Sequence, residues 1–162
     1  MKTENEFTAP WTSTLRIMTL LISILIWGMA VGLLVTNRDM LWFSLLLPLV
    51  AWVLPLFYLV RGYRLEGRTL VIKRLCWDTR VDISDMTSVE TVPKEHFRGS
   101  WRLFGNGGLF ALCGWFWNRK LGRYRAWVTD DDRLVLIQCV DRKLVVSPGQ
   151  PDKFVRVLRA GV

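Results

Sequence analysis

The sequence is poor in the residues that build metal centres, disulfide frameworks and most active sites. It holds three cysteines and one histidine among 162 residues. So small and odd a number of cysteines excludes a disulfide-stapled secreted scaffold and favours a reducing compartment. The cysteines lie too far apart for a zinc half-site, and a single histidine excludes most histidine-based metal sites. We therefore expect no metal and no cofactor.

Acidic residues are scarce as well, with 14 Asp and Glu against 22 Lys and Arg and a formal net charge of +8. At the same time 51% of the residues are hydrophobic, and nine are tryptophan. This aliphatic and aromatic content excludes a disordered chain. A soluble domain this basic is usually less apolar on average, so we expect the chain to consist of an apolar part and a charged part.

The apolar part follows residues 1–16 and begins with residues 17–35, which contain no charged side chain. As a helix this segment would extend about 28 Å, close to the roughly 30 Å hydrocarbon core of a bilayer. Residues 40–60 form a second uncharged segment. Its Pro48 and Pro55 are tolerable in lipid, because neighbouring groups satisfy the freed carbonyls. We therefore predict transmembrane helices over 17–35 and 40–60.

The flanking segments define the topology of these helices. Residues 36–39 are a short polar turn, so the helices must form an antiparallel hairpin. Lys2 and Arg16 precede the first helix, and five Lys or Arg follow the second between residues 61 and 74, whereas the turn holds only Arg38. Because Lys and Arg concentrate in cytoplasmic segments, we expect both termini on the cytoplasmic side and the turn on the external side.

The first predicted helix contains Gly28 and Gly32, which form a GxxxG pair. Glycines at this spacing let two helix backbones approach closely, which favours dimerisation of membrane helices. The same pair could instead seat the second helix of the same hairpin. The sequence leaves both interpretations open.

Residues 62–162 hold nearly all of the excess positive charge, and apolar and polar residues alternate along them as in strands. Runs of this kind occur at 63–65, 69–75, 79–83, 87–92, 125–129, 134–139 and 143–147. The period changes after Pro151, where Phe154, Val157 and Leu158 take positions i, i+3 and i+4 of a short amphipathic helix. We predict a cytoplasmic, mainly β domain with about seven antiparallel strands in a bent barrel and a C-terminal α-helix.

Several segments carry the residues on which a resemblance to a known family rests: 63–65 with 70–72, 102–110, 114–126, and 147–148 before 151–154. They resemble a bacterial pleckstrin-homology (PH) domain family that is carried on a two-helix membrane hairpin. The resemblance covers nearly all of the charged part and implies a PH-like fold in the bacterial inner membrane. Many eukaryotic PH domains bind inositol phosphates through a basic first hairpin loop. Here that loop is only Glu66-Gly67-Arg68, so this ligand is not carried over.

The segment 93–125 is too long for an ordinary connection between strands. It carries seven Lys or Arg against one acid, together with eight aromatic residues and six glycines. The candidate contact residues are Arg102, Trp115, Trp117, Arg119, Lys120, Arg123 and Arg125. One interpretation is contact with anionic headgroups, where each cation contributes about 1 kcal/mol. Another is contact with a protein, since interfaces concentrate Trp, Tyr and Arg. In a third, the aromatic side chains fill the barrel.

Other motifs have structural interpretations. The glycine-rich residues 105–108 lack the Gly-Lys-Ser/Thr end of a phosphate-binding loop, so we expect a bend between strands. The run Asp130-Asp131-Asp132 lacks the alternating ligands, glycine and distal Glu of a calcium loop and is expected to be a turn. We expect His96 to be exposed in a loop and Cys113 to be a buried thiol.

The sequence therefore predicts a protein that is not an enzyme, because it shows no paired carboxylates, catalytic triad signature or dinucleotide loop. We expect the cytoplasmic domain to be a membrane-surface binding module for anionic phospholipid or for a membrane protein partner. The alternative is a structural or accessory subunit of a membrane complex, or a homo-oligomeric scaffold. Nucleic acid is not expected as a partner, because the chain is membrane-anchored and shows no groove-reading helix.

Overall fold

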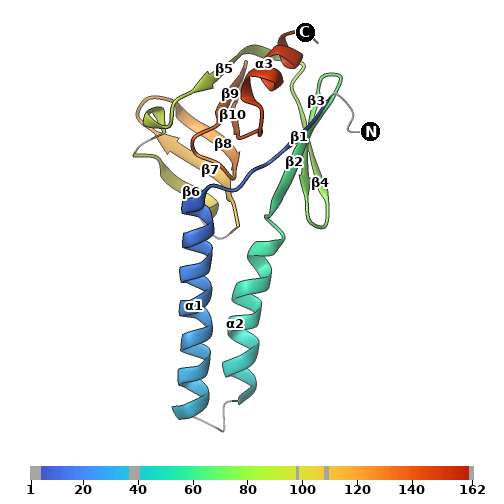
Figure 1. Cartoon of the computed structure of the whole chain (residues 1–162). Coiled ribbons are helices and arrows are strands. Elements are labelled where there is room, and N and C mark those ends of the chain that lie inside the picture. The colour runs from blue at the N-terminus through green and yellow to red at the C-terminus, as the bar shows by residue number, and fades with distance from the viewer. Residues whose placement is uncertain (1–4, 37–40, 98, 108–109, 161–162) are drawn as a thin grey trace.

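Two helices stand side by side at one end of a β domain (Figure 1). The computed structural model describes residues 5–36, 41–97, 99–107 and 110–160. The first helix, α1, is Ser13–Thr36, and the second, α2, is Leu41–Leu56. A helix pair followed by a mainly β domain is the arrangement that the sequence predicts.

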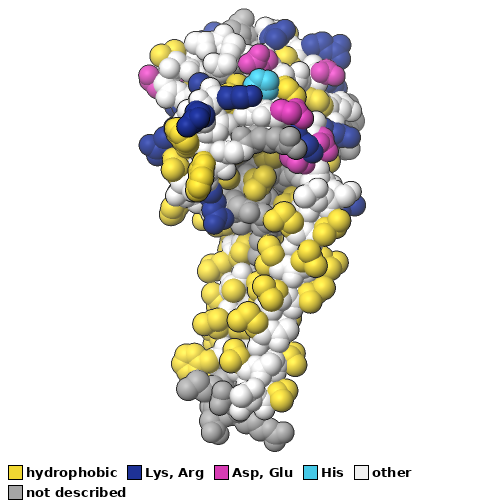
Figure 2. All heavy atoms as spheres, turned by 90° about the vertical axis from the view of Figure 1, so that its left-hand side faces the viewer, with side chains coloured by type: hydrophobic (Ala, Val, Ile, Leu, Met, Phe, Trp, Pro, Cys, Tyr) yellow, Lys and Arg dark blue, Asp and Glu magenta, His cyan; other side chains and the backbone are white. Residues whose placement is uncertain are grey.

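Apolar side chains cover the outside of the helix pair. Figure 2 shows hydrophobic residues along the helices, whereas Lys and Arg appear on the β domain. Among the described helices, Ser13–Thr36 alone is long and apolar enough to cross a membrane by length and composition, and α2 is a shorter apolar helix. The predicted span 40–60 is not helical throughout, because α2 ends at Leu56.

The end of α2 has a local cause. The amides of Phe57, Tyr58 and Leu59 each donate to the carbonyl three residues earlier, which tightens the chain into a turn of the 3-10 type. Val60 then pairs with Arg74 in a sheet. The last four residues of the apolar segment 40–60 therefore form a turn and the start of a strand.

Polar side chains join the two helices near the β domain. Ser23 Oγ donates to the carbonyl of Thr19, and Trp52 Nε1 donates to Ser23 Oγ at 2.9 Å. Gly28 and Gly32 take no part in this packing, since a Cβ added to either would meet no described atom within 4 Å. The glycines therefore do not seat α2, and their face of α1 is open.

The first sheet has four antiparallel strands in the order β1-β2-β3-β4. The strands are β1 (Glu6–Thr8), β2 (Val60–Glu66), β3 (Thr69–Arg74) and β4 (Asp78–Asp82). The sequence did not predict β1, which precedes α1 and pairs with β2, the strand that follows α2. Lys73 and Arg64 both hydrogen-bond to the Glu6 carboxylate and lower its pKa.

The second sheet has six strands in the order β5-β9-β10-β8-β7-β6. They are β5 (Met86–Val92), β6 (Trp101–Gly107), β7 (Leu112–Asn118), β8 (Gly122–Val128), β9 (Leu134–Cys139) and β10 (Lys143–Val146). Each of the seven predicted strands is present, and the segment 93–125 adds β6 and β7 to the described strands.

One strand pair corrects the antiparallel prediction, because β10 runs parallel to β8. The connection from β8 to β9 passes the end of β10, so that β10 lies between them in the sheet. Strand β10 is antiparallel to β9, with which it forms a hairpin, so it runs in the same direction as β8. Alternation along a chain predicts where strands occur but not which strand lies beside which.

The main core lies between the two sheets and against α3, Pro151–Ala160. The Phe154 ring is fully buried, with its centroid 5.0 Å from that of Phe7 and 6.4 Å from that of Tyr63. The predicted C-terminal helix therefore closes the domain. A second cluster, around Phe116 and Tyr124, lies on the other face of the six-stranded sheet.

Candidate functional site

The connection between β6 and β7 docks the β domain onto the helix pair. The amide of Phe110 donates to Thr19 Oγ1 of α1 at 3.3 Å. The Phe110 ring contacts Trp52 of α2 and Trp11, with ring centroids 5.7 and 6.1 Å apart. Only 6% of Phe110 is exposed. Because Phe110 contacts both helices, it fixes the position of the domain relative to them.

A pair of glycines shapes this docking connection. Gly105 and Gly114 lie opposite each other in β6 and β7, with φ angles of +120° and +145°. A Cβ on Gly105 would collide with the carbonyl oxygen of Cys113, and one on Gly114 with that of Phe104. Only glycine fits here. Residues 105–107 thus belong to a strand pair, and the rest of the glycine-rich run lies outside the described residues.

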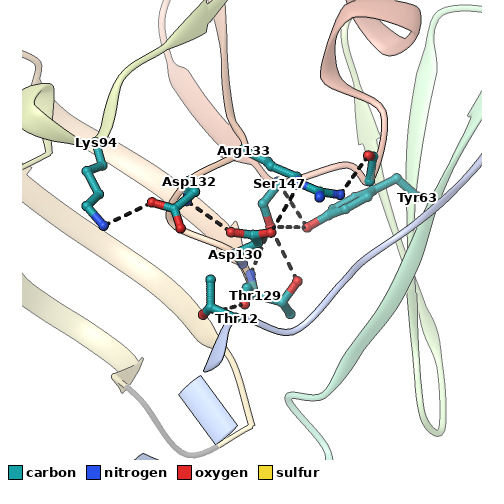
Figure 3. Close-up of polar contacts among 9 residues, drawn as sticks. Thr12, Tyr63, Lys94, Thr129, Asp130, Asp132, Arg133 and Ser147 are labelled. Atoms are coloured by element: carbon teal, nitrogen blue, oxygen red, sulfur yellow. Dashed lines mark hydrogen bonds and ion pairs between the residues drawn. The ribbon is translucent and has the colours of Figure 1, made fainter. Parts of the chain in front are cut away.

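A buried polar junction joins the start of α1 to both sheets (Figure 3). Ser147 follows β10, and its Oγ accepts a hydrogen bond from the Thr129 amide at 2.9 Å. Tyr63 Oη accepts from the Ser147 amide and donates to the carbonyl of Trp127. The Thr12 amide donates to the Thr129 carbonyl. Burial raises the pKa of Tyr63, so its hydroxyl remains protonated and serves this structural network.

The acidic run at the same junction forms the turn between β8 and β9. The carboxylates of Asp130, Asp131 and Asp132 lie within 4.8 Å of one another. Lys94 Nζ is 2.9 Å from Asp132 and 3.5 Å from Asp131, and Arg133 is 3.5 Å from Asp130. The Asp132 amide donates to Asp130 Oδ1, as in an Asx turn. Two cations therefore offset most of the charge of the three carboxylates.

Four of the predicted contact residues come together on one face of β7 and β8. Trp115 lies opposite Arg125, and Trp117 lies opposite Arg123. The Arg123 guanidinium is 4.5 Å from the centroid of the Trp115 ring, and that of Arg125 is 5.6 Å from it. These distances are typical of cation–π contacts. Phe116 points to the other face, into the second core cluster, so the segment contributes to both surface and core.

The remaining predicted contact residues are spread more widely. Arg119 and Lys120 are exposed in the β7–β8 turn. This turn is about 20 Å from Cys113, which lies near the other end of β7. Arg102 is exposed on β6, the edge strand, where Trp101 and Phe104 are 73% and 75% exposed. The ion pairs among the described residues include none of the cations from Arg102 to Arg125.

The sequence analysis missed a basic group at the end of β3. The Arg74 guanidinium is 5.7 Å from the ring centroid of Tyr58 and 5.8 Å from that of Trp77. Arg125 approaches from β8, with its guanidinium 4.5 Å from the Trp127 ring. Burial, and secondly the charge of Arg74, lower the pKa of Arg125. Trp77, three residues after Arg74, was the local signal. Tyr58 lies inside the predicted second span, and Arg125 on the other sheet gives no local sign that it lies near Arg74.

Cys113 lies beside these arginines as a structural thiol. It is 1% exposed, and its Sγ donates to the Tyr58 carbonyl at 3.4 Å. Burial raises its pKa to about 12, although Arg74 and Arg125 act in the opposite direction. The thiol therefore stays neutral near neutral pH and supplies no counter-charge. Cys113 is buried, as the sequence predicts.

A cavity of about 230 Å³ opens on the opposite face of the six-stranded sheet. Its mainly apolar lining includes Phe97, Phe116, Tyr124 and Val145. The cavity contains none of the predicted contact residues. His96 lies nearby in sequence, exposed on a short 3-10 helix, as expected.

Comparison with known proteins gives the fold a family. Residues 61–161, more than half of the chain, match the model of a family described as bacterial PH domain. No curated protein and no solved structure matches the chain. PH domains are generally non-catalytic binding modules. The matched residues form the two sheets except for β1, together with the closing C-terminal helix, and the chain belongs to the bacterial PH domain family.

Proposed function

We propose that this protein is a non-enzymatic binding module anchored in the inner membrane of a bacterium. The helix pair spans the bilayer, and the β domain with both termini lies on the cytoplasmic side. The domain contacts anionic phospholipid headgroups through the β7–β8 surface, which consists of Trp115, Trp117, Arg119, Lys120, Arg123 and Arg125.

The observation that carries this proposal is the lack of acidic partners for the cations of the β7–β8 surface among the described residues. Some other cations of the domain do have acidic partners, as Arg64 has Glu6 and Arg142 has Asp85. Unpaired cations attract the anionic cytoplasmic leaflet, and each contributes about 1 kcal/mol close to the membrane. Tryptophan rings beside them suit the headgroup region.

The docking of the domain supports the same proposal. Phe110 contacts both α1 and α2, so the domain is held at the end of the helix pair. The helix pair also presents an apolar exterior, as a bilayer requires (Figure 2). A tethered surface meets its target at high effective concentration, so weak contacts are sufficient to orient the domain.

Reconstitution of the full chain tests this function. In nanodiscs of phosphatidylcholine mixed with phosphatidylglycerol, hydrogen exchange of residues 112–128 should be slower than in phosphatidylcholine alone. The variant R119E/K120E/R123E/R125E should lose this difference. A control with the same charge change elsewhere, R68E/R80E/K153E/R156E, should retain most of it. Equal exchange of the wild-type protein in both lipids would contradict lipid binding.

A homo-oligomeric scaffold is the second candidate, because the Gly28 and Gly32 face of α1 is open and β6 is an exposed edge strand. Light scattering after size exclusion in mild detergents tests it. A dimer that G28L/G32L converts to a monomer, and that M29L/V31L leaves intact, would support this candidate. A wild-type monomer in several mild detergents would contradict it.

A further inference from the structure

Two arginines meet where the two sheets approach the end of α2. Arg74 is the last residue of β3 in the four-stranded sheet, and Arg125 lies in β8 of the six-stranded sheet. Arg74 lies against the Tyr58 ring, and the Tyr58 carbonyl accepts the hydrogen bond of the buried Cys113 thiol. Cys113 lies opposite Trp127, whose ring Arg125 contacts. The charge of Arg74 also acts on Arg125. The two guanidinium groups, which we call the arginine pair, therefore share one neighbourhood although they come from different sheets.

The arginine pair has aromatic neighbours but no acidic ones among the described ion pairs. Arg74 lies against the rings of Tyr58 and Trp77, and Arg125 lies against those of Trp115 and Trp127. Both arginines are partly buried. Arg74 Nε is completely buried and has no hydrogen-bond partner in the described structure.

Two partly buried like charges side by side cost free energy. Like charges repel each other, and partial burial removes hydration that would screen them. Cation–π contacts offset part of this cost, but they leave the N–H groups of a guanidinium without acceptors. An anion with several oxygen acceptors would offset the rest of this cost. Arginine binds phosphate through two parallel hydrogen bonds, so a phosphate group fits both the charge and the free donors.

The position of the arginine pair identifies the source of the phosphate. Arg74 pairs with Val60, four residues after α2 ends at Leu56. Tyr58 contributes its ring to Arg74 and its carbonyl to Cys113. The arginine pair therefore lies at the level where the helix pair meets the domain, and in a spanning helix pair this is the level of the lipid headgroups. The turn Glu66-Gly67-Arg68 lies at the other end of β2 and β3.

We propose that Arg74 and Arg125 together bind the phosphate group of an anionic phospholipid headgroup. This inference rests on the proposed function and deepens it, because it assigns one defined headgroup site within a broader surface attraction. Tyr58, Trp77, Trp115 and Trp127 form the aromatic walls of the site. Arg119 and Lys120 lie outside it and contribute only surface charge.

Native mass spectrometry of the full chain tests this site. The protein is released from nanodiscs of phosphatidylcholine mixed with phosphatidylglycerol, and the phosphatidylglycerol that it retains is counted. R74Q/R125Q should retain about tenfold less than the wild-type protein, since it loses two charged donors. The matched variant R68Q/R80Q removes the same charge from exposed positions outside the β7–β8 surface and should retain close to the wild-type amount. R74K/R125K keeps the charge but loses the paired donors and should fall between them.

The outcomes separate the site from the broader function. Equal losses in R74Q/R125Q and R68Q/R80Q would overturn the site and leave general attraction to anionic lipid intact. Wild-type protein that retains no phosphatidylglycerol in excess would overturn both. A melting-temperature rise with inorganic phosphate, without retained phosphatidylglycerol, would overturn the lipid as the source. Thermal melts of each variant in detergent identify any that fails to fold, and R125Q alone then replaces the double variant.

Discussion

The amide of Phe110 donates a hydrogen bond to Thr19 Oγ1, although 91 residues separate them in the chain. Through this bond the β6–β7 connection is attached to α1, and the Phe110 ring extends the attachment to Trp52 of α2. The helix pair and the β domain are therefore one mechanical unit. Because the domain is fixed to the helices, their orientation decides which way the cations of the β7–β8 surface face.

Phe110→Ala should weaken this attachment. A buried Phe that is replaced by Ala usually costs about 3–5 kcal/mol, because it leaves a cavity between groups that cannot close completely. Chemical unfolding of the full chain in detergent micelles measures the loss. Phe104→Ala is the matched control, since Phe104 is 75% exposed and should change stability by less than about 0.5 kcal/mol. Equal effects of both substitutions would show that Phe110 does not carry the docking.

Gly114→Ala should destabilise the β6–β7 pair. The new Cβ would collide with the Phe104 carbonyl, and the backbone has a φ of +145° that favours glycine. We expect a cost of about 1–3 kcal/mol and faster hydrogen exchange in β6 and β7. Gly32→Ala, in the open face of α1, should leave the unfolding midpoint nearly unchanged. An unchanged midpoint for Gly114→Ala would contradict the close approach of the two strands.

Stability should fall at alkaline pH because of Cys113. Burial raises its pKa from an ordinary 9.0 to about 12, so the folded protein keeps a proton that the unfolded chain releases. This contribution is complete below about pH 9 and is lost as the pH rises towards 12, at up to about 1.4 kcal/mol per pH unit. Unfolding measured across this range should show a shallower decline in Cys113→Ala. Cys76→Ala, at an exposed thiol, should decline like the wild-type protein.

Arg125→Met should stabilise the protein in neutral detergent. The substitution removes a partly buried charge that repels Arg74 and keeps an apolar side chain against Trp127. Removal of like-charge repulsion is stabilising, and because water screens the partly exposed Arg125 the gain stays below about 1 kcal/mol, which corresponds to a melting-temperature rise of at most roughly 2–4 °C. Differential scanning measurements check this. Added phosphatidylglycerol should raise the melting temperature of the wild-type protein more than that of Arg125→Met, and a reversed order would refute the assignment.

Much of the fold could be predicted because its signals are local. Alternation over a few residues marked seven strands, and the spacing around Phe154 marked the closing helix. The three-residue strand at Phe7 was missed, since its partner Tyr63 lies beyond both helices in the sequence. The parallel pairing of β10 with β8 was missed for the same reason, because the crossing of a connection over a strand end leaves no periodic signal.

The residues of the candidate site also divide into those with a local sequence signal and those without one. Trp115 and Arg123 belong to one hairpin, so their shared face follows from the two-residue period of strands. Arg74 was not recognised as a site residue, because its relation to Arg125 depends on how the two sheets approach each other. The docking role of Phe110 was hidden as well. A single aromatic residue after a glycine-rich run gives no sign that it reaches between two helices.

The placement of β1 also sets an order of events during folding. Its residues are synthesised before α1, but the strand beside it, β2, follows α2. The ion pairs of Glu6 with Arg64 and Lys73 can therefore form only after both helices have been synthesised. Completion of the four-stranded sheet therefore requires two helices between β1 and β2, because the second helix returns the chain to the side where β1 lies. A chain that lacked one helix would carry β2 to the opposite end and leave β1 without its partner.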